Sequence, residues 1–591
     1  MNTIEQRLAA LRAWMEERGL DAFIIPTADP HGSEYVPDHW KCREFLTGFT
    51  GSAGTAVVTR RSAALWTDSR YFLQAADELA GTPFLLMREG QPGTPTVGRW
   101  LAERLAREQT GKRCGVCDLN VPFSFAANLH EETLREVEVV FTDDPFDRIW
   151  PSRPPLPLRP VRRQDERFME IQPAERIRRV MQARGDTMAD CPLLLTDLSE
   201  ICWTLGLRGD DIDFNPVFAA YLFLRPDATG ILFADNDVPP VDGIAQRPYK
   251  DVFAYLSNEA DVANSLYIVD TANARIRQCA SKGGYAVTLA PSPVPPLRAV
   301  KDEGERRGFR LAMERDGVAL VQFRRWLDEA IGRGDALTEQ AVDERLTALR
   351  AAQPGFESLS FGTIAAAGPH GAIVHYEADP TAATPLPKKS FLLLDSGAQY
   401  DCGTTDITRT IPLGPLTDEE RRVYTLVMKA HIGLARLRFP DGTNGLQADT
   451  AARAPLWQAG LDFGHGTGHG VGSHLCVHEG QHQIRKDKRT CTEVPLREGF
   501  TVTDEPGVYL EGRFGVRLEN VLLVRRAADG FLEFEALTLC PFDTAPLILS
   551  MLTHEETAYL NAYHAEVRRR LLPLLSDEAD RAWLLAATRP V

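Results

Sequence analysis

The chain has 591 residues, of which 44% are hydrophobic and 25% charged, with a formal net charge of −16 at pH 7. Such a length exceeds what one hydrophobic core supports, so the sequence predicts several domains. The acidic balance argues against a nucleic-acid partner, because a phosphate-binding surface needs clustered lysine and arginine. No run of 18 apolar residues occurs, so no membrane span is predicted.

The N-terminal segment predicts an amphipathic surface helix and no secretory signal. Apolar residues recur at helical spacing over 4–15, and charged residues interrupt any longer apolar stretch. The ten cysteines form no disulfide framework, and the one close pair, Cys114 and Cys117, lies in a strand-like segment. We therefore expect a reducing, cytoplasmic location.

Two proline-rich stretches, 151–160 and 290–298, divide the chain. Proline removes a backbone donor and fixes φ, so both stretches predict linkers and not the interior of elements. The domains predicted from them are 1–155, 156–298 and 299–591, the last with a C-terminal extension from about residue 537.

The first two domains are predicted to be mixed α/β with similar layouts. Apolar runs predict strands at 21–26 and 63–68 in the first domain, and at 192–196 and 230–234 in the second. The similar layouts of the two domains indicate a duplicated fold.

The third domain is predicted to be α+β or α/β. It opens with a helix whose apolar residues between Met313 and Leu327 share one face, and a later helix begins with a capping box at Thr417. Strand-like runs at 391–400 and 407–413 flank a short Asp-Cys-Gly turn, which favours antiparallel pairing.

Histidines and buried acids indicate a site in this third domain. Eight of the thirteen histidines lie between His370 and His482, under a fifth of the chain. Asp395 follows Phe-Leu-Leu-Leu, and Asp406 lies eleven residues later, so a hairpin would point both carboxylates the same way. Burying such a carboxylate is costly unless a cation compensates it, although a turn-capping role would explain either aspartate alone.

Further acids and one histidine complete a set of metal ligands. Glu505 and Glu519 adjoin apolar, strand-like sequence, and His469 lies in the glycine-rich run 464–472. Four carboxylates and one imidazole suit a pair of hard or borderline divalent ions such as Mn(II) or Co(II) better than a structural zinc. Two closely spaced ions need bridging carboxylates, which explains the number of acids.

Five motifs carry a resemblance to the pita-bread metallopeptidases, which include methionine aminopeptidase, prolidase, aminopeptidase P and the metal-free creatinase. They are Asp-Ser-Gly-Ala-Gln-Tyr, Thr-Thr-Asp-Ile-Thr-Arg-Thr, Gly-His-Gly-Thr-Gly-His-Gly-Val-Gly, Asp-Glu-Pro-Gly and Arg-Leu-Glu-Asn. Segments 26–54 and 207–218 and the tail after Leu537 are similar to the three-domain form of aminopeptidase P. The resemblance implies two creatinase-like α/β domains followed by a pita-bread catalytic domain.

The resemblance also implies how the ligands divide between two ions. Asp395 would chelate one ion, His469 and Glu505 would bind the other, and Asp406 and Glu519 would contact both. A water bridging the two ions would be the nucleophile. Glu505 would accept its proton and pass it toward the leaving proline nitrogen.

Other residues match positions around the family's active site. His375 and His478 would bind substrate and stabilise the tetrahedral intermediate, and His465 would shape the pocket. Tyr509 and Arg517 would orient the acidic ligands.

The implied activity is metal-dependent hydrolysis of the N-terminal Xaa-Pro bond of peptides with proline at the second position. The expected cofactors are two divalent ions, Mn(II) first, with Co, Fe or Zn as alternatives. The resemblance also implies a homodimer, and we expect no nucleic-acid or membrane partner.

Several alternatives compete with this hypothesis. Prolidase activity on Xaa-Pro dipeptides is the nearest, and a metal-free peptide-binding module with a pita-bread fold is the non-enzymatic one. His478 to His482 matches the HExxH pattern of zinc proteases, but Gly480 and the lack of a helix start argue against it, and we expect His482 at the surface. The glycine-rich run matches no nucleotide-binding pattern.

Overall fold

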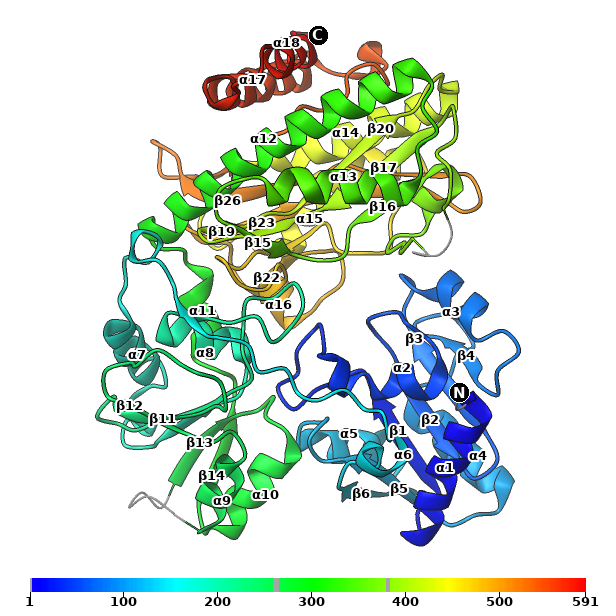
Figure 1. The fold of residues 1–591 in the computed structure, drawn as a ribbon, viewed down its shortest axis with the longest axis vertical. Coiled ribbons are helices and arrows are strands. Elements are labelled where there is room, and N and C mark those ends of the chain that lie inside the picture. Colours follow the sequence, from blue (N-terminus) through cyan, green and yellow to red (C-terminus); the bar gives the residue numbers. More distant parts are fainter. Residues whose placement is uncertain (1–2, 259–264, 379–382) are drawn as a thin grey trace. The chain divides into compact units, whose positions relative to one another are not determined.

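The computed structural model describes residues 3–258, 265–378 and 383–591, traced in Figure 1. The chain forms two compact units. The first comprises Met1–Arg163, Gln172–Asp213 and Val217–Val294, and the second comprises Gln164–Ile171, Phe214–Pro216 and Pro295–Val591. The domain boundaries predicted at 155 and 298 stay predictions.

The first unit contains two six-stranded sheets with the same topology. Their strand orders are β4-β3-β2-β1-β5-β6 and β12-β11-β10-β8-β13-β14. In the first sheet, β1 is antiparallel to β2 and parallel to β5; in the second, β8 is antiparallel to β10 and parallel to β13. The outer pairs β3–β4, β5–β6, β11–β12 and β13–β14 are all parallel. The predicted duplication is therefore confirmed in the topology.

The elements of the first unit follow in chain order. The first sheet has β1 (Ala22–Pro26), β2 (Thr55–Thr59), β3 (Ala63–Thr67), β4 (Leu85–Arg88), β5 (Arg113–Cys117) and β6 (Glu138–Thr142), with α1 (Ile4–Glu17), α2 (Cys42–Thr47), α3 (Phe72–Glu78), α4 (Val97–Glu108), α5 (Ser124–Glu132) and α6 (Phe146–Ile149). The second has β8 (Leu193–Leu195), β10 (Tyr221–Leu224), β11 (Gly230–Phe233), β12 (Ile244–Arg247), β13 (Ser265–Val269) and β14 (Ala286–Ala290), with α7 (Pro173–Gln182), α8 (Leu198–Leu205), α9 (Asp251–Asn258) and α10 (Ala274–Lys282). A short pair joins β7 (Arg162–Arg163) to β9 (Leu207–Arg208).

The second proline-rich stretch departs from its prediction. Residues 151–160 lack regular structure, as expected of a linker, but Val294–Ala299 forms the short helix α11. Its two prolines, Pro295 and Pro296, occupy the first turn, where a backbone N–H has no intrahelical acceptor. Proline is therefore compatible with the start of a helix, and the expectation that this stretch lies outside regular elements was wrong for Val294–Ala299. The stretch nevertheless contains the division between the two units, which falls after Val294.

In the residues that the structure describes, the second unit combines helices with three sheets and one two-stranded pair. The helices are α12 (Glu303–Arg333), α13 (Glu339–Ala351), α14 (Asp418–Ala435), α15 (Gly445–Gln458), α16 (Thr490–Glu493), α17 (His554–Leu571) and α18 (Glu578–Ala587). One sheet has β16 (Ile364–Ala367), β17 (Phe391–Ser396) and β20 (Ile407–Pro412); another has β15 (Phe356–Leu359), β18 (Ala398–Tyr400) and β19 (Gly403–Thr404). A third has β22 (Glu479–Ile484), β21 (Gly468–Gly470), β23 (Thr501–Asp504), β26 (Asn520–Arg526) and β27 (Leu532–Ala536), and β24 (Gly507–Leu510) pairs with β25 (Phe514–Arg517).

The core of this unit fixes which way the β17 side chains point. Leu320 and Phe323 of α12 form one cluster with Leu392 and Leu394 of β17, so one face of the strand packs on that helix. Because side chains alternate along a strand, Asp395 points to the opposite face. The predicted helix faces, the capping box at Thr417 and the hairpin are confirmed.

Helices α12 and α13 are joined by a buried ion pair. Arg350 donates from Nε and Nη2 to the two carboxylate oxygens of Asp316 at 2.8 and 3.0 Å, and Tyr400 also donates to Asp316. We expect Asp316→Ala to lower the free energy of unfolding by about 3–5 kcal/mol, because it leaves a buried guanidinium unpaired. Urea denaturation measures this change.

A surface ion pair in the same unit provides the matched control. Glu566 pairs with Arg569 at 2.6 Å, and their side chains are 44% and 68% exposed respectively. Glu566→Ala should cost less than about 1 kcal/mol. Equal effects of the two variants would contradict the stabilising role of the buried pair.

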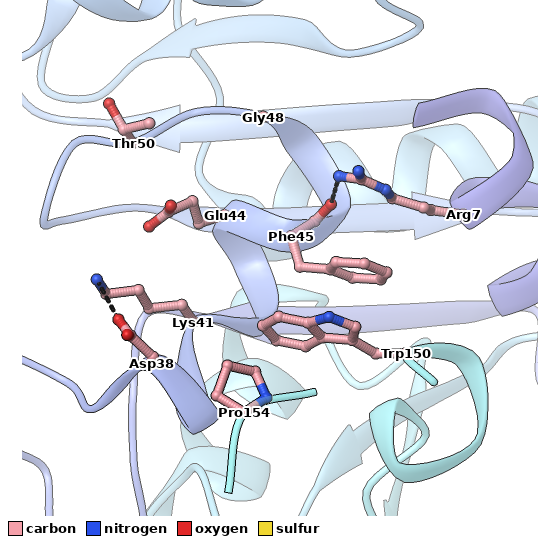
Figure 2. Close-up of a pocket in the computed structure, with 9 residues that line it drawn as sticks. All are labelled: Arg7, Asp38, Lys41, Glu44, Phe45, Gly48, Thr50, Trp150 and Pro154. Carbon is pink, nitrogen blue, oxygen red and sulfur yellow. Dashed lines mark hydrogen bonds and ion pairs between the residues drawn. The ribbon is translucent and has the colours of Figure 1, made fainter. Parts of the chain in front are cut away.

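A pocket of about 340 Å³ lies in the first unit, and Figure 2 shows the side chains that line it. Phe45 stacks on Trp150 there at 4.3 Å between ring centroids, and Lys41 pairs with Asp38 at 2.7 Å. None of the predicted metal ligands lines this pocket. Among the described residues, no helix combines the length and the apolar character needed to cross a bilayer.

Candidate metal centre and active site

Two of the predicted ligands come from the β17–β20 hairpin. Asp395 lies on β17 opposite Thr408, and Asp406 immediately precedes β20. Both carboxylates are buried, with exposed fractions of 8% and 4% for the two residues. The hairpin thus brings the two acids together as the sequence predicted.

The other three predicted ligands come from adjacent strands of the five-stranded sheet. His469 lies on β21, Glu505 directly follows β23, and Glu519 directly precedes β26. Strand β23 pairs with both β21 and β26. In addition, the backbone N–H of Glu519 donates to the carbonyl of Thr408, which joins this sheet to the hairpin.

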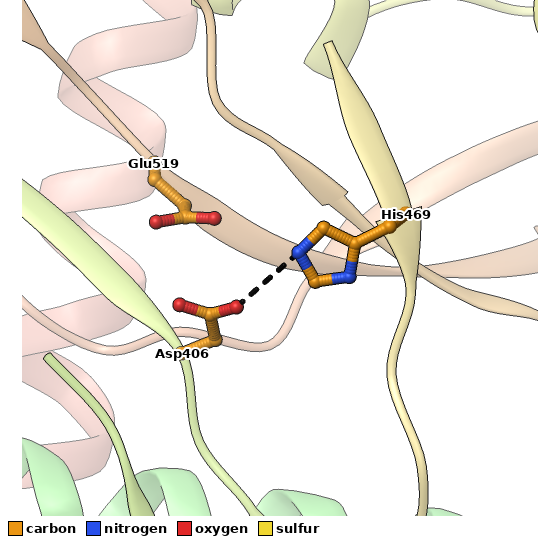
Figure 3. A group of neighbouring side chains, drawn as sticks. All are labelled: Asp406, His469 and Glu519. Carbon is orange, nitrogen blue, oxygen red and sulfur yellow. Dashed lines mark ion pairs between the residues drawn. The ribbon is translucent and has the colours of Figure 1, made fainter. Parts of the chain in front are cut away.

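The side chains of Asp406, His469 and Glu519 converge on one point (Figure 3). One donor atom from each lies within 4.8 Å of the others. His469 Nε2 is 3.6 Å from Asp406 Oδ2 and 3.7 Å from Glu505 Oε1. Donors about 2.0–2.2 Å from a shared cation have comparable separations, so these side chains could hold an ion.

Arg517 connects Asp395 to Tyr509 and, through the Tyr509 hydroxyl, to His465. It donates to Asp395 Oδ2 from Nη2 at 2.6 Å and from Nε at 3.1 Å, and to the Tyr509 hydroxyl from Nη1 at 2.8 Å. The Tyr509 hydroxyl also contacts His465 Nε2 at 2.7 Å. Asp395 Oδ1 is buried and has no hydrogen-bond partner among the described residues, which leaves an anionic oxygen for a cation.

The electrostatics of the cluster also fit a cation. Burial raises the pKa of Asp406 and of Glu519 well above their usual values, and repulsion among the neighbouring carboxylates raises them further. Burial likewise raises the pKa of Glu505 to about 7. Carboxylates this close together in a buried site favour binding of positive charge, and the oxygen-rich set suits hard divalent ions.

Of the predicted substrate histidines, His478 lies beside the cluster. The rings of His478 and His469 meet edge to face at 4.4 Å between centroids. His375 lies in the half-buried segment between β16 and β17, where the carbonyl of the preceding Val374 accepts a hydrogen bond from Arg517 at 3.4 Å. Burial lowers the pKa of His465 to about 3, so that ring is neutral beside Tyr509.

Four family models match successive parts of the chain. Residues 7–149 and 152–305 each match a creatinase/prolidase N-terminal domain. Residues 307–526 match metallopeptidase family M24, and 530–591 match the C-terminal region of peptidase M24.

Full-length relatives agree with these models. Aminopeptidase P2 of Arabidopsis thaliana is 37% identical over 100% of this chain and 89% of its own length. A probable Xaa-Pro aminopeptidase P of Laccaria bicolor is also 37% identical, over 100% and 94% respectively. The chain belongs to metallopeptidase family M24.

One solved structure matches this M24 chain over its full length. The X-prolyl aminopeptidase of Caenorhabditis elegans, described as a cytosolic enzyme with a di-nuclear active site, superposes with a TM-score of 0.93. It is 32% identical, and the match covers 100% of both chains. A prolidase of Pyrococcus horikoshii, 21% identical with a TM-score of 0.50, covers 62% of this chain and 99% of its own, and shows the fold alone.

Some residues that hold the M24 site together were not predicted. Thr408 donates to Glu519 Oε2 at 2.7 Å, and Thr503 accepts from the backbone N–H of His469 at 3.0 Å. Buried Arg409 donates to the backbone carbonyl of Glu519 at 2.6 Å. Thr408 and Arg409 lie in the quoted Thr-Thr-Asp-Ile-Thr-Arg-Thr motif, but only the fold shows which partners they meet.

The HExxH pattern in this M24 chain does not form a zinc-protease helix. Residues Glu479–Ile484 form strand β22, so successive side chains alternate between faces. His482 is fully buried, where it stacks on Phe500 and its Nε2–H donates to the Thr501 carbonyl at 2.9 Å. The expectation that His482 lies at the surface was wrong, because β22 is covered on this side.

His482 makes stability depend on pH. Burial lowers its pKa to about 4, below the ordinary 6.5, so the unfolded chain binds more protons as the pH falls between these values. We expect His482 to contribute a loss of roughly 2 kcal/mol in the free energy of unfolding between pH 7 and pH 5. His482→Gln removes this titration, so urea denaturation should show a correspondingly smaller pH-dependent loss; an identical loss in both proteins would contradict the account.

Proposed function

We propose that the protein is a metal-dependent aminopeptidase that hydrolyses the N-terminal Xaa-Pro bond of peptides. The observation that carries this proposal is the cluster of four carboxylates and one histidine, in which Asp395, Asp406 and Glu519 are buried, within a chain that resembles Xaa-Pro aminopeptidases over its full length. The match to Xaa-Pro aminopeptidases over the full length of the chain supports this activity over that of prolidase.

Five side chains would hold two divalent ions. Asp395 would bind one ion, His469 and Glu505 the other, and Asp406 and Glu519 both. Three observations support this set: the buried carboxylates, the convergence around His469, and the Asp395 Oδ1 atom, which has no hydrogen-bond partner in the described part of the chain. When bound, such ions polarise a scissile carbonyl and acidify water. We propose Mn(II) as the native metal, because oxygen ligands with a single imidazole suit it.

Glu505 and the residues around the five ligands act on substrate and protons. Glu505 accepts the proton of the attacking water at a carboxylate oxygen and delivers it to the proline nitrogen. His375 and His478 bind the substrate and stabilise the negative charge that develops on its carbonyl oxygen. The Arg517–Asp395 contact and the Tyr509–His465 contact orient the acids and shape the pocket.

We propose a cytoplasmic location on two observations. Ten cysteines are free in the structure, consistent with a reducing cytoplasm, and the C. elegans neighbour is described as cytosolic. We also propose a homodimer, as the resemblance to three-domain aminopeptidase P implies.

Peptide cleavage by metal-stripped protein, with and without added Mn(II), tests the proposal. The substrates are an Arg-Pro-Pro peptide, an Arg-Ala-Ala peptide and an Xaa-Pro dipeptide. We expect Mn-dependent release of the first residue from the Arg-Pro-Pro peptide only. Cleavage confined to the dipeptide would indicate prolidase, and cleavage of none with any divalent metal would favour the peptide-binding module.

A further inference from the structure

The segment that carries His375 is held by a buried glutamate outside the metal centre. This segment leaves β16 at Ala367 and forms a short 3₁₀ helix over Gly368–Ala372 before it reaches His375. Glu339, the first residue of α13, packs against it with an exposed fraction of 0%. None of the predicted roles involves this carboxylate.

Three groups of the segment donate to Glu339. Its Oε1 accepts from the backbone N–H of Ala367 at 2.7 Å and from His370 Nδ1 at 3.0 Å, and its Oε2 accepts from the Tyr376 hydroxyl at 2.8 Å. The His370 and Tyr376 rings stack at 4.4 Å between centroids. The Glu339 carboxylate therefore accepts hydrogen bonds from the segment both before and after His375.

The opposite side of the segment lies against β25. A Cβ atom built at Gly515 would come within 1.7 Å of the Gly371 carbonyl oxygen, so the two backbones are in direct contact. Arg517, at the end of the same strand, donates to the Val374 carbonyl at 3.4 Å. The segment is thus fixed between the start of α13 and the strand that also supports Asp395.

The free-energy cost of burying the Glu339 carboxylate favours a positioning role for this residue. A fully buried carboxylate is costly unless its oxygens are satisfied. Glu339 meets this requirement with three donors from one segment and with its place at a helix N-terminus, where negative charge is favoured. Its hydrogen bond raises the pKa of His370, which favours the protonated ring as a donor.

We propose that Glu339 is a positioning residue for catalysis, which holds His375 toward the substrate by binding the flanking Ala367, His370 and Tyr376. This inference rests on the proposed role of His375. It predicts that removing a hydrogen bond to Glu339 impairs turnover only when His375 is present.

A double-mutant cycle on the Mn-reconstituted enzyme tests the proposal. Tyr376→Phe removes one hydroxyl but keeps the stacked ring, and is combined with His375→Ala. Tyr424→Phe is the control. Tyr424 lies in α14, and its hydroxyl donates to the backbone carbonyl of Asp543 at 2.9 Å, so the change also removes one hydrogen-bonded hydroxyl. The measurements are kcat and KM on the Arg-Pro-Pro peptide, metal content and the melting temperature.

We expect Tyr376→Phe to lower kcat/KM by about 5–10-fold with metal content unchanged, the size of one lost hydrogen bond. In the His375→Ala background the same change should have no further effect, and Tyr424→Phe should leave kcat/KM unaltered. An equal loss in both backgrounds, or no loss in either, would overturn the positioning role. If His375→Ala alone cleaves at the normal rate, the role of His375 fails as well, whereas the proposed aminopeptidase activity stands.

Discussion

Replacing Glu505 with alanine is expected to abolish turnover and to remove most of the bound metal. Glu505 is a proposed ligand and the proposed proton carrier, and its Oε1 lies 3.7 Å from His469 Nε2. Loss of a group with both functions should lower kcat/KM by at least about 10²–10⁴-fold, the range of general acid–base catalysis alone. Peptide cleavage and metal analysis on the same preparations measure the two effects.

Two further variants separate the functions of Glu505. Glu505→Gln keeps an oxygen ligand but cannot carry the proton, so it should retain more metal than the alanine variant and still turn over poorly. Glu511→Ala is the matched control, because this glutamate lies six residues along the chain and is exposed. Normal metal content and normal rate in Glu505→Ala would refute the assignment.

Replacing His478 with alanine is expected to keep the metal but slow the reaction. His478 packs edge to face on His469, yet it is not one of the three residues whose donor atoms converge. If His478 stabilises charge on the substrate oxygen, its loss should lower kcat by about 10²–10³-fold. Metal content should match the wild type.

The control for His478 is His554→Ala, since His554 is exposed at the start of α17. A His478 variant that loses its metal would assign this residue to the metal centre, and one with an unchanged rate would remove it from the mechanism. Either result would contradict the proposed role.

Local sequence patterns were enough to predict the hairpin that carries Asp395 and Asp406, but not strand β21, which carries His469. The apolar run before Asp395 and the short turn after Tyr400 indicated a hairpin, and the structure pairs β17 with β20. Burial of the acids next to apolar sequence was also predictable, because strand residues alternate between faces. The family motifs supplied the roles of individual residues, which the local patterns did not.

Contacts between distant segments could not be predicted. Thr408 meets Glu519 and Glu339 meets Tyr376 only because strands and helices far apart in sequence pack together. The burial of His482 likewise depends on what covers β22, and a local pattern contains no such information. The helix at Val294–Ala299 was missed because proline was judged as a breaker without regard to its position in the first turn.

The most direct test of the central claim is the position of bound metal in a crystal of the Mn-reconstituted protein. Anomalous diffraction should reveal two peaks about 3.5–4 Å apart, both within the cluster formed by Asp395, Asp406, His469, Glu505 and Glu519. Metal content should rise to two equivalents as cleavage of the Arg-Pro-Pro peptide reaches its maximum. A single peak, or peaks outside these five residues in fully active protein, would contradict the account.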